Sequence, residues 1–386
     1  MLQPMPIIDI VDAVANPRSA WRTLRGVKPV CHNSHPIYVT GNAAVVFTIK
    51  HEGREKRLKC YTRTNPHLAA IYGKKFLPRE LCITTFTGEK MWIDCLLCEN
   101  IEGGTLDEVI GSTSCCEEFA TLAKNFDLMA CKLLGGDMAH GDLKPENIIV
   151  GSDGQMHLID FDSAYIDSMA GEQSPEIGTA AYQHPTRDTD FFDRHLDDYS
   201  IAMLSTTLHA AALDRRIAES WRQTHEPPFS PREIVERKSA LFDEVVELFA
   251  RRGLAREYRI ARMLYSLSPR LFNLESTLRF SLPTSLTTTT RSATLEQEGG
   301  LWGCRGDEGW IVPPLYDDGF EPSNDGMVVV LGGYTHLISL RSGLIVRSFD
   351  KGVVVRPIDN RRIAISNPDT RQEVLEWESL LQNSTK

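Results

Sequence analysis

The chain has 386 residues, of which 42% are hydrophobic and 24% charged, a composition typical of a globular protein with room for two domains. Its formal net charge of −10 disfavours nucleic-acid binding, which calls for a basic surface. The nine cysteines lack the spacing of a disulfide framework. No stretch approaches the ~20 apolar residues of a membrane span, and the first residues do not resemble a secretory signal. We therefore expect a soluble, cytoplasmic protein that binds neither nucleic acid nor membrane.

The first part of the chain predicts a strand-rich unit. Residues 7–25 favour short helices with a break near Pro17. Strand-like runs between residues 36 and 62 are separated by Gly41-Asn42 and by the polar segment HEGREK, a pattern typical of an antiparallel meander. A short helix in HLAAIYGKKF precedes two further strands, in ELCITTF and KMWIDCLLCE.

The middle of the chain predicts helices. Residues 117–134 carry apolar side chains at three- and four-residue spacing, and similar patterns return over 196–280. The Ser/Thr-rich stretch at 281–293 indicates a linker, and short alternating runs after it indicate a small all-β domain over 294–386. We expect this domain to be a separable attachment.

The strongest pattern for function lies in residues 139–166, AHGDLKPENIIVGSDGQMHLIDFDSAYI. Two strand-like runs flank GSDG, in which Asp153-Gly154 favours a hairpin turn. Asn147 and Asp160 are equally distant from this turn, so the hairpin brings an amide oxygen and a carboxylate together at its open end. Such oxygen ligands suit Mg²⁺, which keeps waters and adds phosphate oxygens.

Two further residues of this segment favour transfer of a phosphoryl group. Asp142 precedes Asn147 by five residues, where its carboxylate can accept a proton from an incoming hydroxyl. Lys144 adds a positive charge that suits the transferred group. A surface hairpin with polar residues at its open end would explain one or two of these residues, but it would not explain their combination.

HGDLKPEN followed by LIDFD resembles the catalytic loop and the metal-binding loop of the protein-kinase family, and LKPEN is most similar to the serine/threonine-directed members. The resemblance implies an α+β, two-lobed fold over residues 27–280, with a β-rich N-lobe, a helical C-lobe and an N-terminal helical extension over 1–26. It also implies ATP and Mg²⁺ as cofactors and a protein substrate. Asp142 would be the catalytic base and Lys144 a phosphate contact, with Asn147 and Asp160 as magnesium ligands.

The same resemblance suggests further nucleotide contacts. Lys59 matches the lysine that holds the α- and β-phosphates, and Gly41 with Val46 resembles a reduced glycine-rich loop and its valine. Glu99 to Ile101 would offer backbone groups to adenine.

The chain also departs from the family pattern. Asp162 replaces a glycine, which should stiffen the metal-binding turn, and Gly141 replaces an arginine. The helix expected after Lys59 has no glutamate to pair with that lysine, which favours weak or absent catalysis; Glu80 is a candidate replacement. Asp197 matches a buried aspartate that braces the catalytic loop.

Near the C-terminus, GGLWGCRGDEGWIVPPLYDDGF resembles a bacterial WG-type β repeat, with Trp302 and Trp310 expected as core anchors. The two resemblances together indicate a bacterial serine/threonine-type kinase whose WG-repeat domain could recruit a protein partner. Two alternatives stay open: a small-molecule kinase, and a pseudokinase scaffold that binds nucleotide and recruits partners through the β domain.

Overall fold

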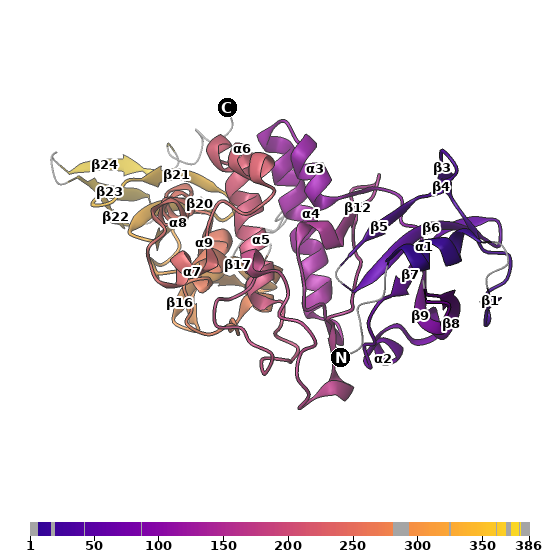
Figure 1. Ribbon diagram of the computed structural model, residues 1–386. Helices are drawn as coiled ribbons and strands as arrows, with labels where there is room; N and C mark the ends of the chain where they lie inside the picture. Colours follow the sequence, from indigo (N-terminus) through magenta and orange to yellow (C-terminus); the bar gives the residue numbers. More distant parts are fainter. Residues whose placement is uncertain are drawn as a thin grey trace.

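The protein is described by a computed structural model for residues 7–16, 20–41, 43–85, 87–280, 293–323, 326–359, 361–367, 372–377 and 379. It contains both helices and antiparallel strands, which confirms the mixed α+β class. Figure 1 shows an N-terminal sheet at one end, a group of helices in the middle, and the C-terminal strands at the other end.

The N-terminal sheet has seven strands in the order β1-β8-β9-β7-β6-β2, with β5 paired to β6. Its strands are β1 (Ala20–Trp21), β2 (Lys28–Pro29), β5 (Tyr38–Thr40), β6 (Ala44–His51), β7 (Arg54–Tyr61), β8 (Phe76–Thr84) and β9 (Lys90–Glu99). A separate hairpin joins β3 (Cys31–His32) to β4 (His35–Pro36). Period-two alternation places Phe47 and Ile49 on one face, where they pack with Ile10 of helix α1 (Ile7–Ala15).

The N-terminal extension differs from the prediction for residues 1–26. The helix expected to follow Pro17 is wrong, because Ala20 and Trp21 form strand β1 and pair with Cys82 and Leu81 of β8. Pro17 itself lies outside the described residues. Local helical periodicity was overridden here by hydrogen bonding to the sheet.

Several short elements lie outside the main strands of the N-terminal sheet and the long helices. Between β7 and β8 lie α2 (Leu68–Tyr72) and the 3₁₀ turn η1 (Gly73–Lys75). A small sheet then joins β10 (Gly104–Thr105), β12 (Ile148–Val150) and β13 (Met156–Leu158). The remaining short elements are β11 (Met138–Ala139) paired with β14 (Tyr165–Ile166), and the 3₁₀ turns η2 (Pro145–Asn147), η3 (Asp167–Met169) and η4 (Ala180–Tyr182).

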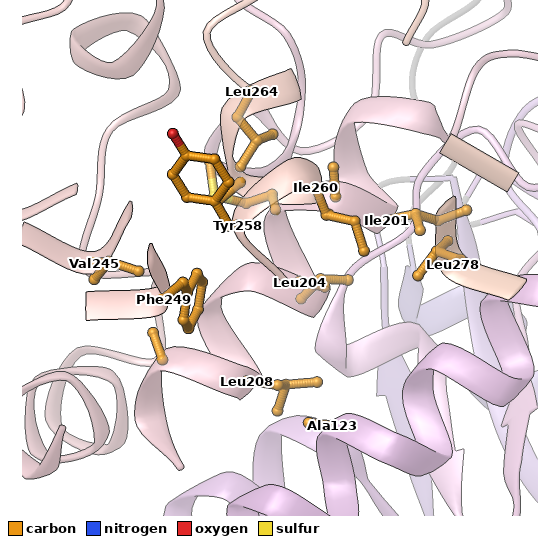
Figure 2. Packing of buried hydrophobic residues seen from close by; sticks show 14 of the residues in the cluster. Ala123, Ile201, Leu204, Leu208, Val245, Phe249, Tyr258, Ile260, Leu264 and Leu278 are labelled. Atoms are coloured by element: carbon orange, nitrogen blue, oxygen red, sulfur yellow. The ribbon is translucent and has the colours of Figure 1, made fainter. Parts of the chain in front are cut away.

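The middle of the molecule is built around α5 (Asp198–Ala211), which is buried along almost its whole length. The other helices are α3 (Leu106–Ser112), α4 (Cys116–Leu134), α6 (Arg215–Thr224), α7 (Pro231–Val235), α8 (Ala240–Arg252), α9 (Ala255–Met263) and α10 (Leu274–Arg279). Figure 2 shows Leu204 and Leu208 of α5 among Phe249 of α8, Ile260 of α9 and Ala123 of α4. The packing of these helices holds in place the two ends of the loop segment between α4 and α5.

The C-terminal part consists of three antiparallel sheets. Their strands are β15 (Thr294–Glu298), β16 (Leu301–Gly306), β17 (Gly309–Tyr316), β18 (Asp318–Gly319), β19 (Gly326–Leu331), β20 (Tyr334–Ser339), β21 (Ile345–Phe349), β22 (Val354–Pro357), β23 (Arg362–Ser366) and β24 (Glu373–Glu376). Trp302 and Trp310, expected as core anchors, are only half-buried, whereas Trp377 is fully buried. The predicted linker falls almost wholly in residues 281–292, outside the described residues.

Part of the C-terminal strands shares a hydrophobic core with the helices, while a smaller cluster around Trp377 and Phe349 packs among the strands alone. Leu315 and Val329 belong to the same buried cluster as Phe249 of α8 and Ile260 of α9. At its edge, Arg259 Nε donates to the backbone oxygen of Leu315 at 2.8 Å. This packing argues against a separable C-terminal attachment, since separation would expose apolar faces of α8 and α9 to water.

Candidate active site

The β12–β13 hairpin places Asn147 and Asp160 at its open end. Gly151 faces Gln155 across the turn, and Gly154 closes it with φ +78° and a 2.9 Å hydrogen bond to the oxygen of Gly151. The hairpin is therefore centred on Asp153, and Asn147 accepts a 3.0 Å backbone hydrogen bond from Ile159. The register differs by one residue from the predicted Asn147–Asp160 pairing, because the turn has an odd number of residues.

A buried aspartate holds the loop that precedes the hairpin. Asp197 is 1% exposed, and its carboxylate accepts hydrogen bonds from the backbone amides of His140 and Gly141. This confirms that Asp197 braces the loop. The His140 ring donates from Nε2 to the oxygen of Ile159 at 2.8 Å and lies 4.8 Å from the Phe161 ring. The loop is thus tied to both the helical core and the hairpin.

Gly141 occupies a position that excludes a side chain. Its φ is +83°, and a Cβ atom there would lie 2.1 Å from the backbone oxygen of Ser163. The departure from the arginine of protein kinases therefore has a steric reason in this chain.

Asp142 lies among hydrogen-bond donors. Its Oδ1 accepts from the Thr179 amide at 2.7 Å, and its Oδ2 lies 3.1 Å from Lys144 Nζ. Asn147 Nδ2 donates to the Asp142 backbone oxygen at 2.9 Å, and Lys144 Nζ donates to Thr179 Oγ1 at 3.0 Å. Burial disfavours the charged carboxylate, but Lys144 and Thr179 outweigh it, so the pKa of Asp142 lies below its ordinary value. The side chain is held ionised and oriented.

Lys59 reaches this loop from the N-terminal sheet. It lies on β7, opposite Val46 of β6 and Leu96 of β9. Its Nζ lies 2.6 Å from Asp160 Oδ1 and 2.6 Å from Asp162 Oδ2. Burial opposes the ammonium charge, but the two carboxylates outweigh it and raise the pKa of Lys59.

Asp162 is a site residue whose role the sequence reasoning missed. Its Oδ1 accepts hydrogen bonds from Tyr61 at 2.9 Å and Tyr72 at 2.8 Å, while its Oδ2 faces Lys59. The signal in the sequence was the acid in place of glycine, combined with a helix lacking glutamate.

Glu80 does not contact Lys59. Its carboxylate is fully buried and accepts from the Thr23 amide at 2.8 Å, the Leu24 amide at 2.7 Å and Thr23 Oγ1 at 2.6 Å. All three bonds anchor the segment that follows β1. This placement does not support Glu80 as the replacement partner of Lys59.

The remaining residues predicted to contact nucleotide lie in the N-terminal sheet or directly after it. Gly41 lies in the turn between β5 and β6, and a Cβ there would make only ordinary contact, 3.7 Å from the oxygen of Ala44. Half-buried Val46 lies beside Lys59 in the sheet. Glu99 ends β9 and pairs with Lys56 at 3.2 Å, and half-buried Ile101 lies in the link to β10.

The side chains present fit a magnesium–nucleotide complex better than a metal held by protein alone. Among the described residues, no group of three or more His, Cys, Asp or Glu side chains could hold a metal ion. Asn147 uses its amide nitrogen as a donor to Asp142, so its amide oxygen is the atom that a cation would use, together with the Asp160 carboxylate. Two protein oxygens are few for Mg²⁺, which takes further ligands from water and phosphate.

Comparisons with known proteins place part of the chain near protein kinases. No protein-family model matches the chain. It is 31% identical over 126 residues to a probable serine/threonine-protein kinase, pknA2, of Bifidobacterium longum, covering 31% of this chain and 15% of that protein. It is 34% identical over 119 residues to the serine/threonine-protein kinase PknL of Mycobacterium tuberculosis, covering 28% of this chain and 29% of that protein.

The chain thus matches less than a third of the length of these curated relatives. The relation to proteins named serine/threonine kinases is distant and partial, and supports a kinase-like function at that level. Separately, no helix in the described part of the chain is long and apolar enough to cross a membrane.

Proposed function

We propose that this chain is a protein-kinase-like phosphotransferase that uses ATP and Mg²⁺ to phosphorylate serine or threonine hydroxyls of a protein. One observation carries the proposal: Lys59 and Asp160, which are 101 residues apart in the sequence, meet at 2.6 Å between the N-terminal sheet and the hairpin. A lysine beside an aspartate and an asparagine is the set needed to bind phosphates and their magnesium ion.

Each residue has a role in this proposal. Asp142 accepts the proton of the incoming hydroxyl and orients it, and Lys144 stabilises negative charge on the transferred group. Lys59 holds the nucleotide phosphates, while Asn147 and Asp160 hold the metal. When bound, Mg²⁺ supplies neutralisation of phosphate charge.

The choice of a protein substrate rests on the distant relatives, which are named serine/threonine-protein kinases. Thr179, which donates to Asp142, is followed by residues that line an open pocket of about 520 Å³. Its lining includes Ala181, Phe229 and Arg232, which could offer apolar and charged contacts to a side chain of the substrate. Recruitment of a partner by the C-terminal strands, and their likeness to WG repeats, stay predictions.

The test uses the full chain, a thermal-shift measurement with Mg-ATP and transfer of labelled phosphate to itself and to a generic protein substrate. Asp160→Ala should abolish the magnesium-dependent thermal shift and the transfer. Asp167→Ala is a matched control, because Asp167 is an exposed carboxylate seven residues further along the chain. A wild-type shift retained in Asp160→Ala would contradict the metal site.

A shift without any transfer in the wild-type protein would instead favour a nucleotide-binding scaffold. One observation favours that alternative: α2 (LAAIY) has no carboxylate to pair with Lys59.

A further inference from the structure

Lys59 has a second acidic neighbour that the proposed metal site does not use. Asp160 is needed as a metal ligand, so its bond to Lys59 cannot persist unchanged when a cation and phosphates bind. Asp162 Oδ2 makes an equally short contact, 2.6 Å, from the same loop. The Asp162 side chain is 17% exposed, whereas that of Asp160 is 46% exposed.

Two tyrosines orient the Asp162 carboxylate. The hydroxyls of Tyr61 and Tyr72 both donate to Oδ1, at 2.9 and 2.8 Å, which leaves Oδ2 to face Lys59. Burial, and then the charge of Asp162, raises the pKa of both phenols well above the ordinary value. Both hydroxyls therefore stay protonated and act as permanent donors.

The backbone at Asp162 is also fixed to the N-terminal part of the chain. Asn65 Nδ2 donates to the Asp162 oxygen at 3.0 Å. Tyr61 ends β7 and Tyr72 ends α2, so three side chains from one connected segment hold this residue. Such multiple contacts position a half-buried carboxylate more strictly than a single ion pair would.

We propose that Asp162 is the positioning residue of Lys59, replacing the glutamate that the helix after β7 lacks. The inference rests on the proposed function. The absence of a glutamate in the helix after Lys59 favoured weak or absent catalysis. In this proposal the loop that carries Asp160 supplies the missing carboxylate instead of α2. Asp160 is then available for the metal while Asp162 keeps the Lys59 ammonium aimed at the phosphates.

The variant Asp162→Gly restores the glycine that protein kinases have at this position. That variant should impair this chain, since it removes the partner of Lys59. With purified full chain, we expect Asp162→Gly and Asp162→Asn to raise the KM for ATP roughly tenfold or more, as for loss of a charge-assisted hydrogen bond. Tyr72→Phe should have a smaller effect in the same direction, Asp162→Glu should retain part of the affinity, and the exposed control Asp167→Asn should have none.

A double-mutant cycle separates positioning from general structural support. If Asp162 acts through Lys59, Asp162→Asn should add little to the loss in kcat/KM caused by Lys59→Met. Fully additive losses, or a wild-type KM for ATP in Asp162→Asn, would overturn the inference. If Asp162→Asn does not fold, the cycle is run with Tyr72→Phe, and additivity with Lys59→Met overturns the inference equally.

The same cycle run on unfolding without nucleotide distinguishes the two proposals. Coupling between Lys59 and Asp162 in the unfolding free energy would show that the pair forms. If Mg-ATP at the same time had no effect on the wild-type protein, the proposed function and the catalytic role of the pair would both be overturned. Normal Mg-ATP binding and transfer with no coupling in either measurement would overturn the inference alone.

Discussion

At the scale of single residues, the proposed phosphoryl transfer depends on how Asp142 is held. Thr179 and Lys144 satisfy its two carboxylate oxygens, and its lowered pKa keeps it ionised through the neutral range. In the proposed reaction, a weakly basic carboxylate of this kind would orient the acceptor hydroxyl and take its proton late, once bonding to phosphorus has made that hydroxyl more acidic.

Asp142→Ala should therefore separate chemistry from binding. We expect phosphoryl transfer to fall by roughly 10² to 10⁴-fold, in the range of general-base contributions, with the Mg-ATP thermal shift near that of wild type. Single-turnover transfer and thermal shift measure the two effects. Equal turnover in both proteins, with contaminating kinases excluded, would remove Asp142 from the mechanism. In the wild type, the lowered pKa predicts no loss of transfer from protonation of Asp142 between pH 5 and 8.

Gly141 gives a second prediction at this scale. Gly141→Ala should destabilise the protein by roughly 2 kcal/mol or more and reduce transfer, because positive φ and a backbone clash act together. The control is Gly171→Ala, where φ is +88° but a Cβ would meet nothing within 4 Å. Chemical unfolding compares the two variants, and equal losses of stability would show that the Ser163 contact is unimportant.

At the scale of elements, Glu80 shows how a buried charge can anchor a strand. Its three hydrogen bonds go to the segment after β1, on the edge of the N-terminal sheet. A buried carboxylate with three donors is stable, but the amides of Thr23 and Leu24 would lose their partner without it.

Glu80→Ala should lower the free energy of unfolding by roughly 2–4 kcal/mol, from unpaired buried donors and a cavity, while leaving the KM for ATP within about twofold. Chemical unfolding and ATP kinetics, both below the unfolding temperature of the variant, provide the readouts. Glu89→Ala serves as the control, since Glu89 is exposed in the turn between β8 and β9. A large rise in KM with little loss of stability would return Glu80 to the nucleotide site.

At the scale of the whole molecule, the C-terminal strands and the helices stabilise each other. Besides the apolar core they share, Tyr334 and Lys351 both bond to Glu247 of α8, and His336 Nε2 donates to the Ala250 oxygen at 3.0 Å. Figure 1 shows β17 and β20 alongside α8 and α9.

A chain ending at residue 280 should therefore aggregate or unfold at a lower temperature than the full chain. Removal of the strands exposes apolar side chains of α8 and α9, such as Phe249 and Ile260, that pack with them in one core. Thermal unfolding and binding of a hydrophobic dye measure the change. An unaltered unfolding temperature, with the Mg-ATP shift retained, would show that the strands are a separable attachment after all.

The same interface predicts sensitivity to acid. His336 is fully buried, and burial lowers its pKa from 6.5 to about 4. Because the pKa of His336 is lower in the folded state than in the unfolded state, the contribution of this neutral histidine to the unfolding free energy is fully present above pH 6.5. That contribution is lost as the pH falls towards 4. His336→Gln should flatten this part of the pH dependence of the unfolding free energy, and identical slopes in the two proteins would contradict the assignment.

Local spacing was enough to predict several features of this protein. The mixed α+β class followed from a change in apolar periodicity along the chain. The hairpin carrying Asn147 and Asp160 followed from the turn residues between its strands, with an error of one residue in register. Turn chemistry and periodicity are properties of neighbouring residues, so they can be read from a single sequence.

Only the tertiary structure decided which groups meet across the chain. Glu80 lies 57 residues from Thr23, and Tyr61 lies 101 residues from Asp162. Spacing carries no information about such pairs, because their contacts arise from the packing of whole sheets and helices. Packing likewise decided whether the C-terminal strands are separable. The sequence favoured an independent all-β domain, yet besides a small cluster of their own these strands cover apolar faces of α8 and α9.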